Sequence, residues 1–177
     1  MRKGVFTVFV VAAFLVCPLY CAGDDNAITA GYGFGMFNLS PKYGKLRGDN
    51  GNYYFYQLVY AREKTLVKNL CLLMEPFVAY VNDPQSGLDA GMMLSLKYYF
   101  NKDNKNSFFV TLGTGAAYTT ILFEEQGSHL LFILQGGIGY RWNNYFIENR
   151  FRHYSNGGTE NPNRSINANI VNIGVHF

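Results

Sequence analysis

His153 and Ser155 lie two positions apart near the carboxyl end of the chain. On a β-strand these two side chains share one face, because successive side chains point to opposite faces. An imidazole beside a serine hydroxyl can take its proton and so activate the oxygen as a nucleophile toward an ester carbonyl. The pair therefore predicts acyl-ester hydrolysis. The competing interpretation is a chance spacing, with the histidine lying at the rim of a sheet for reasons unrelated to catalysis.

The surrounding sequence predicts an all-β fold that would position this pair. Apolar residues alternate with polar or small ones at a period of two, and a helical spacing of apolar positions is hard to find. Connections rich in Asn, Asp, Gly, Pro and Lys separate the alternating segments. About eight strands are expected, at 28–36, 53–62, 71–81, 88–100, 110–118, 132–141, 145–155 and 165–177. An even number of strands suits a closed antiparallel barrel.

Two kinds of closed barrel differ in which face is apolar. A soluble lipocalin-like barrel encloses an apolar cavity, whereas an outer-membrane barrel has an apolar outer wall and a polar interior. Several segments reach about 10 residues, the length that a tilted strand needs to cross a bilayer. The last strand alternates apolar residues and ends in Phe177, a pattern typical of outer-membrane barrels. We therefore predict an eight-stranded antiparallel transmembrane β-barrel of the bacterial outer membrane.

In such a narrow barrel the charged face of each strand points inward, where side chains fill the interior and neutralise one another. The residues expected there are Glu75, Asp89, Lys97, Gln135, Arg141, Glu148, Arg150 and Arg152. This parity places His153 and Ser155 on the opposite, outer face, toward lipid.

The first 23 residues have the pattern of a secretory signal peptide. Arg2 and Lys3 precede an apolar run of about 16 residues, and small residues follow it. A membrane-anchoring helix is the alternative, but this run is short against the roughly 20 residues that a spanning helix needs. We expect residues 1–23 to be removed and residues 24–177 to form a single barrel domain.

The composition after residue 23 argues against several functions. The formal net charge falls from +3 to about +1, because Arg2 and Lys3 leave with the signal segment, and the remaining basic residues form no stripe for nucleic acid. Cys71 then remains without a partner for a disulfide within the chain. His129 and His176 have no Cys or acidic residue at metal-ligand spacing, so we expect neither a metal nor a cofactor.

The segment around the pair reads FRHYSNGGTENPNRSIN, and it resembles the PagL-type lipid A 3-O-deacylases of Gram-negative outer membranes. That family's HxSN signature, with a following Gly and an NP or PN pair, is matched by His153, Tyr154, Ser155, Asn156, Gly158, Pro162 and Asn163. The segment covers about a tenth of the chain, and the rest is similar in barrel class and length. The resemblance implies hydrolysis of the 3-O-linked acyl ester of lipid A by a serine esterase, with release of a 3-hydroxy fatty acid.

The resemblance also assigns roles to individual residues. Ser155 is the nucleophile, His153 is the general base, and Asn163 donates a hydrogen bond to the developing oxyanion. Backbone N–H groups at Gly157 and Gly158 are further candidate donors.

The family usually completes a triad with an acid fourteen residues beyond the histidine, where this chain has Asn167. Asparagine can accept the imidazole N–H and fix the tautomer, but it cannot stabilise imidazolium as a carboxylate does. We expect Asn167 to be the third member rather than Glu160 in the preceding loop, because strand parity places Asn167 on the face of His153. Replacing the acid by Asn costs a Ser-His-Asp enzyme about 10⁴-fold in turnover, so a slow or inactive member is an open alternative.

A site on the outer wall suits a substrate that is itself a bilayer component. The expected partners are lipid A or lipopolysaccharide and other outer-membrane lipids, and a homodimer of two barrels is left open. Two other functions compete with the esterase. One is a non-catalytic OmpA-like structural or adhesion barrel in which the segment is a relic or a contact with lipid headgroups. The other is a soluble ligand-binding barrel, which would purify without detergent.

Overall fold

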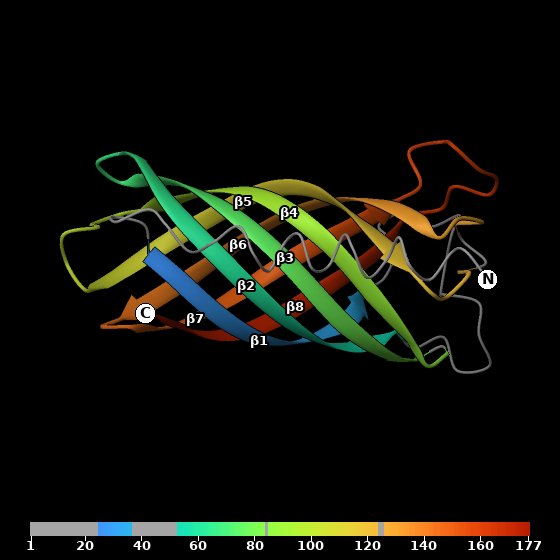
Figure 1. Cartoon of the computed structure of the whole chain (residues 1–177), viewed down its shortest axis with the longest axis horizontal. Helices are drawn as coiled ribbons and strands as arrows, with labels where there is room; N and C mark the ends of the chain where they lie inside the picture. Colours follow the sequence, from blue (N-terminus) through green and yellow to red (C-terminus); the bar gives the residue numbers. More distant parts are fainter. Residues whose placement is uncertain (1–24, 37–52, 84, 124–125) are drawn as a thin grey trace, which may run out of the picture.

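The computed structural model describes residues 25–36, 53–83, 85–123 and 126–177, so the predicted signal peptide at 1–23 lies outside the described residues. Eight antiparallel strands form a closed barrel, in which each pairs with its neighbours in the chain and β1 pairs with β8 (Figure 1). The strands are β1 Asp25–Met36, β2 Tyr54–Val67, β3 Leu70–Asp83, β4 Gly87–Tyr99, β5 Asn106–Thr119, β6 Leu130–Trp142, β7 Tyr145–Ser155 and β8 Ile166–His176. The predicted eight-stranded antiparallel barrel is confirmed. Within the described ranges no helix is both long and apolar enough to cross a membrane.

Several strands are longer than the alternation of apolar residues predicts. β2 continues to Val67 rather than ending at 62, and β5 begins at Asn106 rather than at 110. The ladder between β2 and β3 is still paired at Lys64 and Leu72. The period-two signal fades there because the strand ends carry polar residues, whereas the backbone hydrogen bonds continue.

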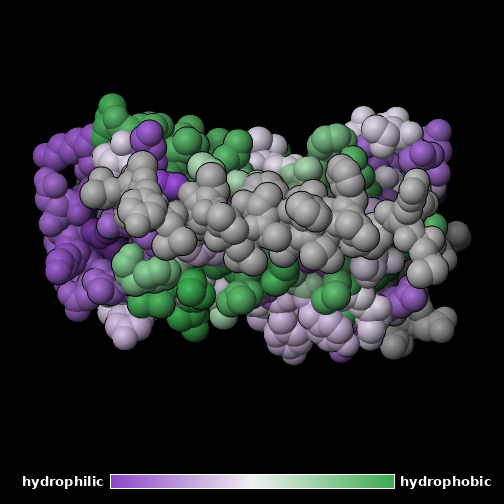
Figure 2. All heavy atoms as spheres, in the orientation of Figure 1, coloured by the Kyte–Doolittle hydropathy of each residue, from purple (hydrophilic) through white to green (hydrophobic). Residues whose placement is uncertain are grey.

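The two faces of several strands differ in polarity, although the interior also contains apolar side chains. In β4, exposed leucines of the outer wall alternate with buried polar residues, as in the successive pairs Leu88 and Asp89, Leu94 and Ser95, and Leu96 and Lys97. Figure 2 shows hydrophobic residues along the upper and lower sides of the visible face and hydrophilic residues gathered at its left end. An apolar wall around a polar interior is the arrangement of outer-membrane barrels and the reverse of a soluble ligand-binding barrel.

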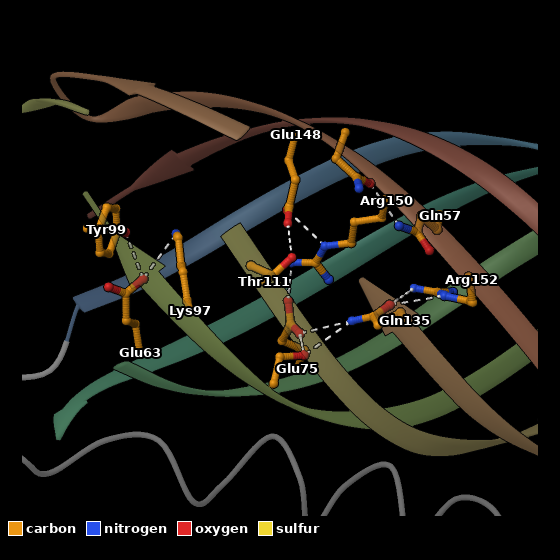
Figure 3. A network of polar contacts seen from close by, with 12 residues as sticks. Gln57, Glu63, Glu75, Lys97, Tyr99, Thr111, Gln135, Glu148, Arg150 and Arg152 are labelled. Carbon is orange, nitrogen blue, oxygen red and sulfur yellow. Dashed lines mark hydrogen bonds and ion pairs between the residues drawn. The ribbon is translucent and has the colours of Figure 1, made fainter. Parts of the chain in front are cut away.

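Every residue that the strand parity assigns to the interior is buried there, including Asp89, Gln135 and Arg152. The centre of the interior network is Glu75, which accepts hydrogen bonds from Arg150 Nη2 at 2.7 Å and from Ser95 Oγ at 2.6 Å. Figure 3 shows Glu75, Arg150 and Glu148 directed toward one another inside the barrel. Arg150 also pairs with Glu148 at 2.8 Å. This network lies directly behind β7, the strand that carries His153 and Ser155 on its other face.

The interior network makes a prediction about stability. Replacing Glu75 by leucine is expected to lower the free energy of unfolding by about 3–5 kcal/mol, because buried Arg150 loses one of its two carboxylate partners. Urea titration of the barrel refolded in lipid vesicles measures the change. Glu160→Gln, at an exposed loop position, is the matched control. Equal unfolding midpoints for the two variants would contradict the role given to this network.

Candidate active site

β7 ends and β8 begins at one end of the barrel, opposite the end at which β8 finishes (Figure 1). Arg152 and Tyr154 of β7 point inward and are fully buried, at 0% and 1% exposure. His153 and Ser155 alternate with them and lie half-buried on the outer wall. The strand thus holds the two reactive side chains on one face, while the interior packing of their neighbours fixes the backbone between them.

Asn167 of β8 lies directly across from His153 of β7. His153 Nδ1 and Asn167 Oδ1 are 2.8 Å apart, and Asn167 is buried although it belongs to the outer wall. An amide oxygen only accepts hydrogen bonds, so His153 Nδ1 carries the proton. The Nε2 atom of the neutral ring then has a free lone pair, and this is the tautomer that a general base requires.

Apolar side chains of β6 border the pair. Leu134 lies across from His153, and Phe132 lies across from Ser155. Among the described residues, Ser155 Oγ has no hydrogen-bond partner. The two residues share a face, but the structure holds no hydrogen bond between them. Catalytic hydrogen bonds are often long before substrate binds and shorten in the complex.

The loop after Ser155 carries the three candidate oxyanion donors. Asn163 Oδ1 accepts the Asn156 backbone N–H at 3.2 Å, which identifies its free amide end as the donor Nδ2. Gly157 has a φ of +66°, and a Cβ there would lie 2.9 Å from the Phe132 ring, so glycine is strongly favoured at this turn. The Gly158 N–H donates to Asn156 Oδ1 at 2.8 Å. Gly158 is therefore already engaged within the loop, whereas Gly157 N–H has no partner among the described residues.

Asn156 is a residue of the candidate site to which sequence reasoning assigned no role. It is fully buried, and its Nδ2 lies within hydrogen-bond distance of three carbonyl oxygens, those of Gln126 at 2.5 Å, Glu160 at 2.8 Å and Pro162 at 3.2 Å. Its Oδ1 accepts the N–H two residues on, which is the Asx turn that an Asn before two glycines favours. That local pattern was the available signal, whereas Gln126 lies 30 residues away and gave none.

The remaining candidates are separate from the pair. Glu160 is exposed, and no hydrogen bond or ion pair joins its carboxylate to His153 in the described part of the chain. Cys71 is buried and free. His129 contacts the Tyr118 ring and the Thr119 carbonyl. Over the described ranges, no three His, Cys, Asp or Glu side chains are grouped so that they could hold a metal ion.

A closed eight-stranded barrel with an apolar outer wall and a charged interior defines the class of small outer-membrane β-barrels. Within that class, residues 53–176 match the family model described as "Lipid A 3-O-deacylase (PagL)". Because the match covers more than half of the chain, the protein belongs to the PagL family. The resemblance seen in its sequence is confirmed.

Solved structures share the fold. The crystal structure of the outer membrane enzyme PagL is similar with a TM-score of 0.60 and 19% identity, over 85% of this chain and 98% of that one. The N-terminal β-barrel domain of Pseudomonas aeruginosa OprF is similar with a TM-score of 0.52 and 13% identity, over 86% of this chain and 97% of that one. Neisserial surface protein A is similar with a TM-score of 0.52 and 11% identity, over 88% of this chain and 96% of that one. No curated protein sequence matches the chain. Since a surface protein has the fold of an enzyme, the barrel alone does not decide the function.

Proposed function

We propose that this protein is an outer-membrane lipid A 3-O-deacylase, exported by a signal peptide at residues 1–23. Family membership supports lipid A as the substrate. The observation that carries the proposal is the hydrogen bond from His153 to Asn167 on the outer wall. His153 lies two positions before Ser155 on the same strand face. The hydrogen bond orients a base on the face where a membrane lipid arrives.

The proposed reaction proceeds through an acyl-enzyme. His153 Nε2 takes the proton of Ser155 Oγ, which attacks the ester carbonyl carbon. Asn163 Nδ2 and the Gly157 N–H donate to the oxyanion of the tetrahedral intermediate. The bond between the acyl carbon and the glucosamine oxygen breaks, and His153 returns the proton to that oxygen. Water, deprotonated by His153, then hydrolyses the acyl-enzyme and releases a 3-hydroxy fatty acid.

The position of the site explains how a lipid can reach it. His153 and Ser155 face outward, so lipopolysaccharide approaches sideways within its own leaflet and needs no channel through the packed interior. Phe132 and Leu134 supply apolar surface beside the pair for the acyl chain. All groups in this mechanism come from one barrel, and none of its steps uses a cofactor.

The second candidate function is a non-catalytic barrel with a relic site. One observation favours it: Asn167 is uncharged and cannot stabilise the imidazolium that forms when Ser155 attacks. Purified barrel incubated with lipid A distinguishes the two functions. The esterase releases a 3-hydroxy fatty acid that mass spectrometry detects, whereas a relic leaves the lipid intact.

A pair of alanine variants identifies the residue that supports the histidine. Asn167→Ala is expected to lower turnover about tenfold or more, because His153 Nδ1 loses the acceptor that fixes its tautomer. Glu160→Ala should leave turnover unchanged, since its carboxylate is exposed and apart from the ring. Steady-state ester hydrolysis by the two variants is the measurement. A loss in Glu160→Ala alone would transfer the role to that residue.

A further inference from the structure

Gln126, in the connection between β5 and β6, ties together both ends of the site loop formed by residues 156–165. The side chain is fully buried. Its Nε2 lies 3.5 Å from the carbonyl oxygen of Tyr154, which precedes Ser155, and also donates to the carbonyl oxygen of Arg164, which follows Asn163. One amide group thus spans the stretch of backbone between the proposed nucleophile and the proposed oxyanion donor.

The backbone of Gln126 holds the middle of the same loop. Its carbonyl oxygen accepts Asn156 Nδ2 at 2.5 Å, and Asn156 in turn binds the carbonyl oxygens of Glu160 and Pro162. The Asn156 N–H donates to Asn163 Oδ1. Gln126 and Asn156, which we call the loop clamp, therefore connect a separate part of the chain to the side chain of Asn163.

The orientation of the Gln126 side-chain amide indicates that its N–H groups serve as hydrogen-bond donors to the loop backbone. Both partners of Nε2 are carbonyl oxygens, which only accept, so this end of the amide has to be the donor. Gln126 Oε1 is buried and has no hydrogen-bond partner among the described residues. A desolvated, unpaired amide oxygen costs free energy that an apolar side chain of similar size would not. Filling space alone would thus be served better by methionine.

We infer that Gln126 is a positioning residue for the oxyanion site, acting through the loop clamp to hold Asn163 at a fixed distance from Ser155. This inference rests on the proposed deacylase function. Its physical reason is that donors must lie about 3 Å from the oxyanion, and a misplacement of about 1 Å costs on the order of 100-fold in rate.

The test compares Gln126→Met and Gln126→Glu with wild type in ester hydrolysis. Both variants keep the size of the side chain and remove its N–H donors. The expected result is a 10- to 100-fold lower kcat with KM changed less than twofold, because the oxyanion forms after the substrate binds. Ser128→Ala is the control in the same connection, since among the described residues that hydroxyl hydrogen-bonds only to the backbone of Leu130. Its kcat should equal that of wild type.

A double-mutant cycle with Asn163→Ala separates positioning from a general loss of structure. If Gln126 acts through Asn163, then Gln126→Met causes no further loss of kcat in the Asn163→Ala background. Losses that multiply would overturn the inference. Migration of the unboiled protein on a denaturing gel reports whether the barrel is folded, and failure of both Gln126 variants to fold would also overturn it in favour of a structural role.

The outcomes distinguish this inference from the function on which it rests. If wild type hydrolyses the ester, Asn163→Ala is slow, and both Gln126 variants match wild type, then only the positioning role is wrong. If folded wild type hydrolyses no ester at all, the proposed function is wrong and the positioning role falls with it.

Discussion

The Ser155→Ala variant is expected to release 3-hydroxy fatty acid from lipid A about 10⁴-fold more slowly than wild type, or more slowly still. Without the hydroxyl no acyl-enzyme forms, and His153 and the loop donors have no nucleophile to assist. The barrel should remain as stable as wild type, since Ser155 is half-buried on the outer wall and its hydroxyl has no partner among the described residues.

The measurement is the rate of fatty-acid release by purified, folded protein, followed by mass spectrometry. Ser86→Ala is the matched control, because it removes an exposed serine hydroxyl from the connection between β3 and β4. It should hydrolyse lipid A at the wild-type rate. A Ser155→Ala variant as fast as this control would show that another group is the nucleophile.

The Asn167→Asp variant is expected to gain turnover, about tenfold at least and up to about 10⁴-fold. The upper bound is the cost of the reverse change, acid to Asn, in a Ser-His-Asp enzyme. Aspartate has the size of asparagine and would keep the oxygen that now lies 2.8 Å from His153 Nδ1. Its negative charge would add what the amide lacks, the stabilisation of imidazolium when Ser155 loses its proton.

Asn169→Asp is the control for this gain. Asn169 lies on the same strand and the same outer face, but it faces Phe151 rather than His153. Both variants place a new carboxylate on the wall, but only Asn167→Asp places it beside the imidazole. Asn169→Asp also removes the N–H that donates to Asn149 Oδ1, a contact remote from the proposed triad. Equal turnover of the two variants, or a loss in Asn167→Asp, would contradict the assignment of Asn167 as the third member of the triad.

Sequence alone predicts much of the barrel, because the alternation of apolar and polar residues indicates both where the strands lie and which side chains point inward. The inward parity of Glu75, Glu148 and Arg150 is confirmed by their burial. The predicted positions of the strand ends were less accurate, since polar residues such as Lys64 continue the backbone hydrogen-bond ladder after the apolar alternation stops.

Contacts between strands and between loops could not be predicted from the sequence alone, because they depend on strand register and loop geometry. Asn149 and Asn169 are polar residues on an apolar wall, and they hydrogen-bond to each other at 2.7 and 3.0 Å across β7 and β8. That pairing depends on the register of the two strands, which alternation by itself does not specify. The contact of Gln126 with Asn156 likewise depends on how two loops meet. By contrast, strand parity alone placed His153 and Asn167 on the same outer face, and the register of β7 and β8 sets them directly across from each other.

Mass spectrometry of lipid A tests the central claim most directly. A Gram-negative host expresses the wild-type chain beside Ser155→Ala and His153→Ala variants at equal levels of folded barrel. The account predicts that lipid A loses the mass of one 3-hydroxyacyl group with the wild type only. Unchanged lipid A with the folded wild-type barrel, in a host whose lipid A carries the 3-O-linked acyl chain, would contradict the account and favour the non-catalytic barrel.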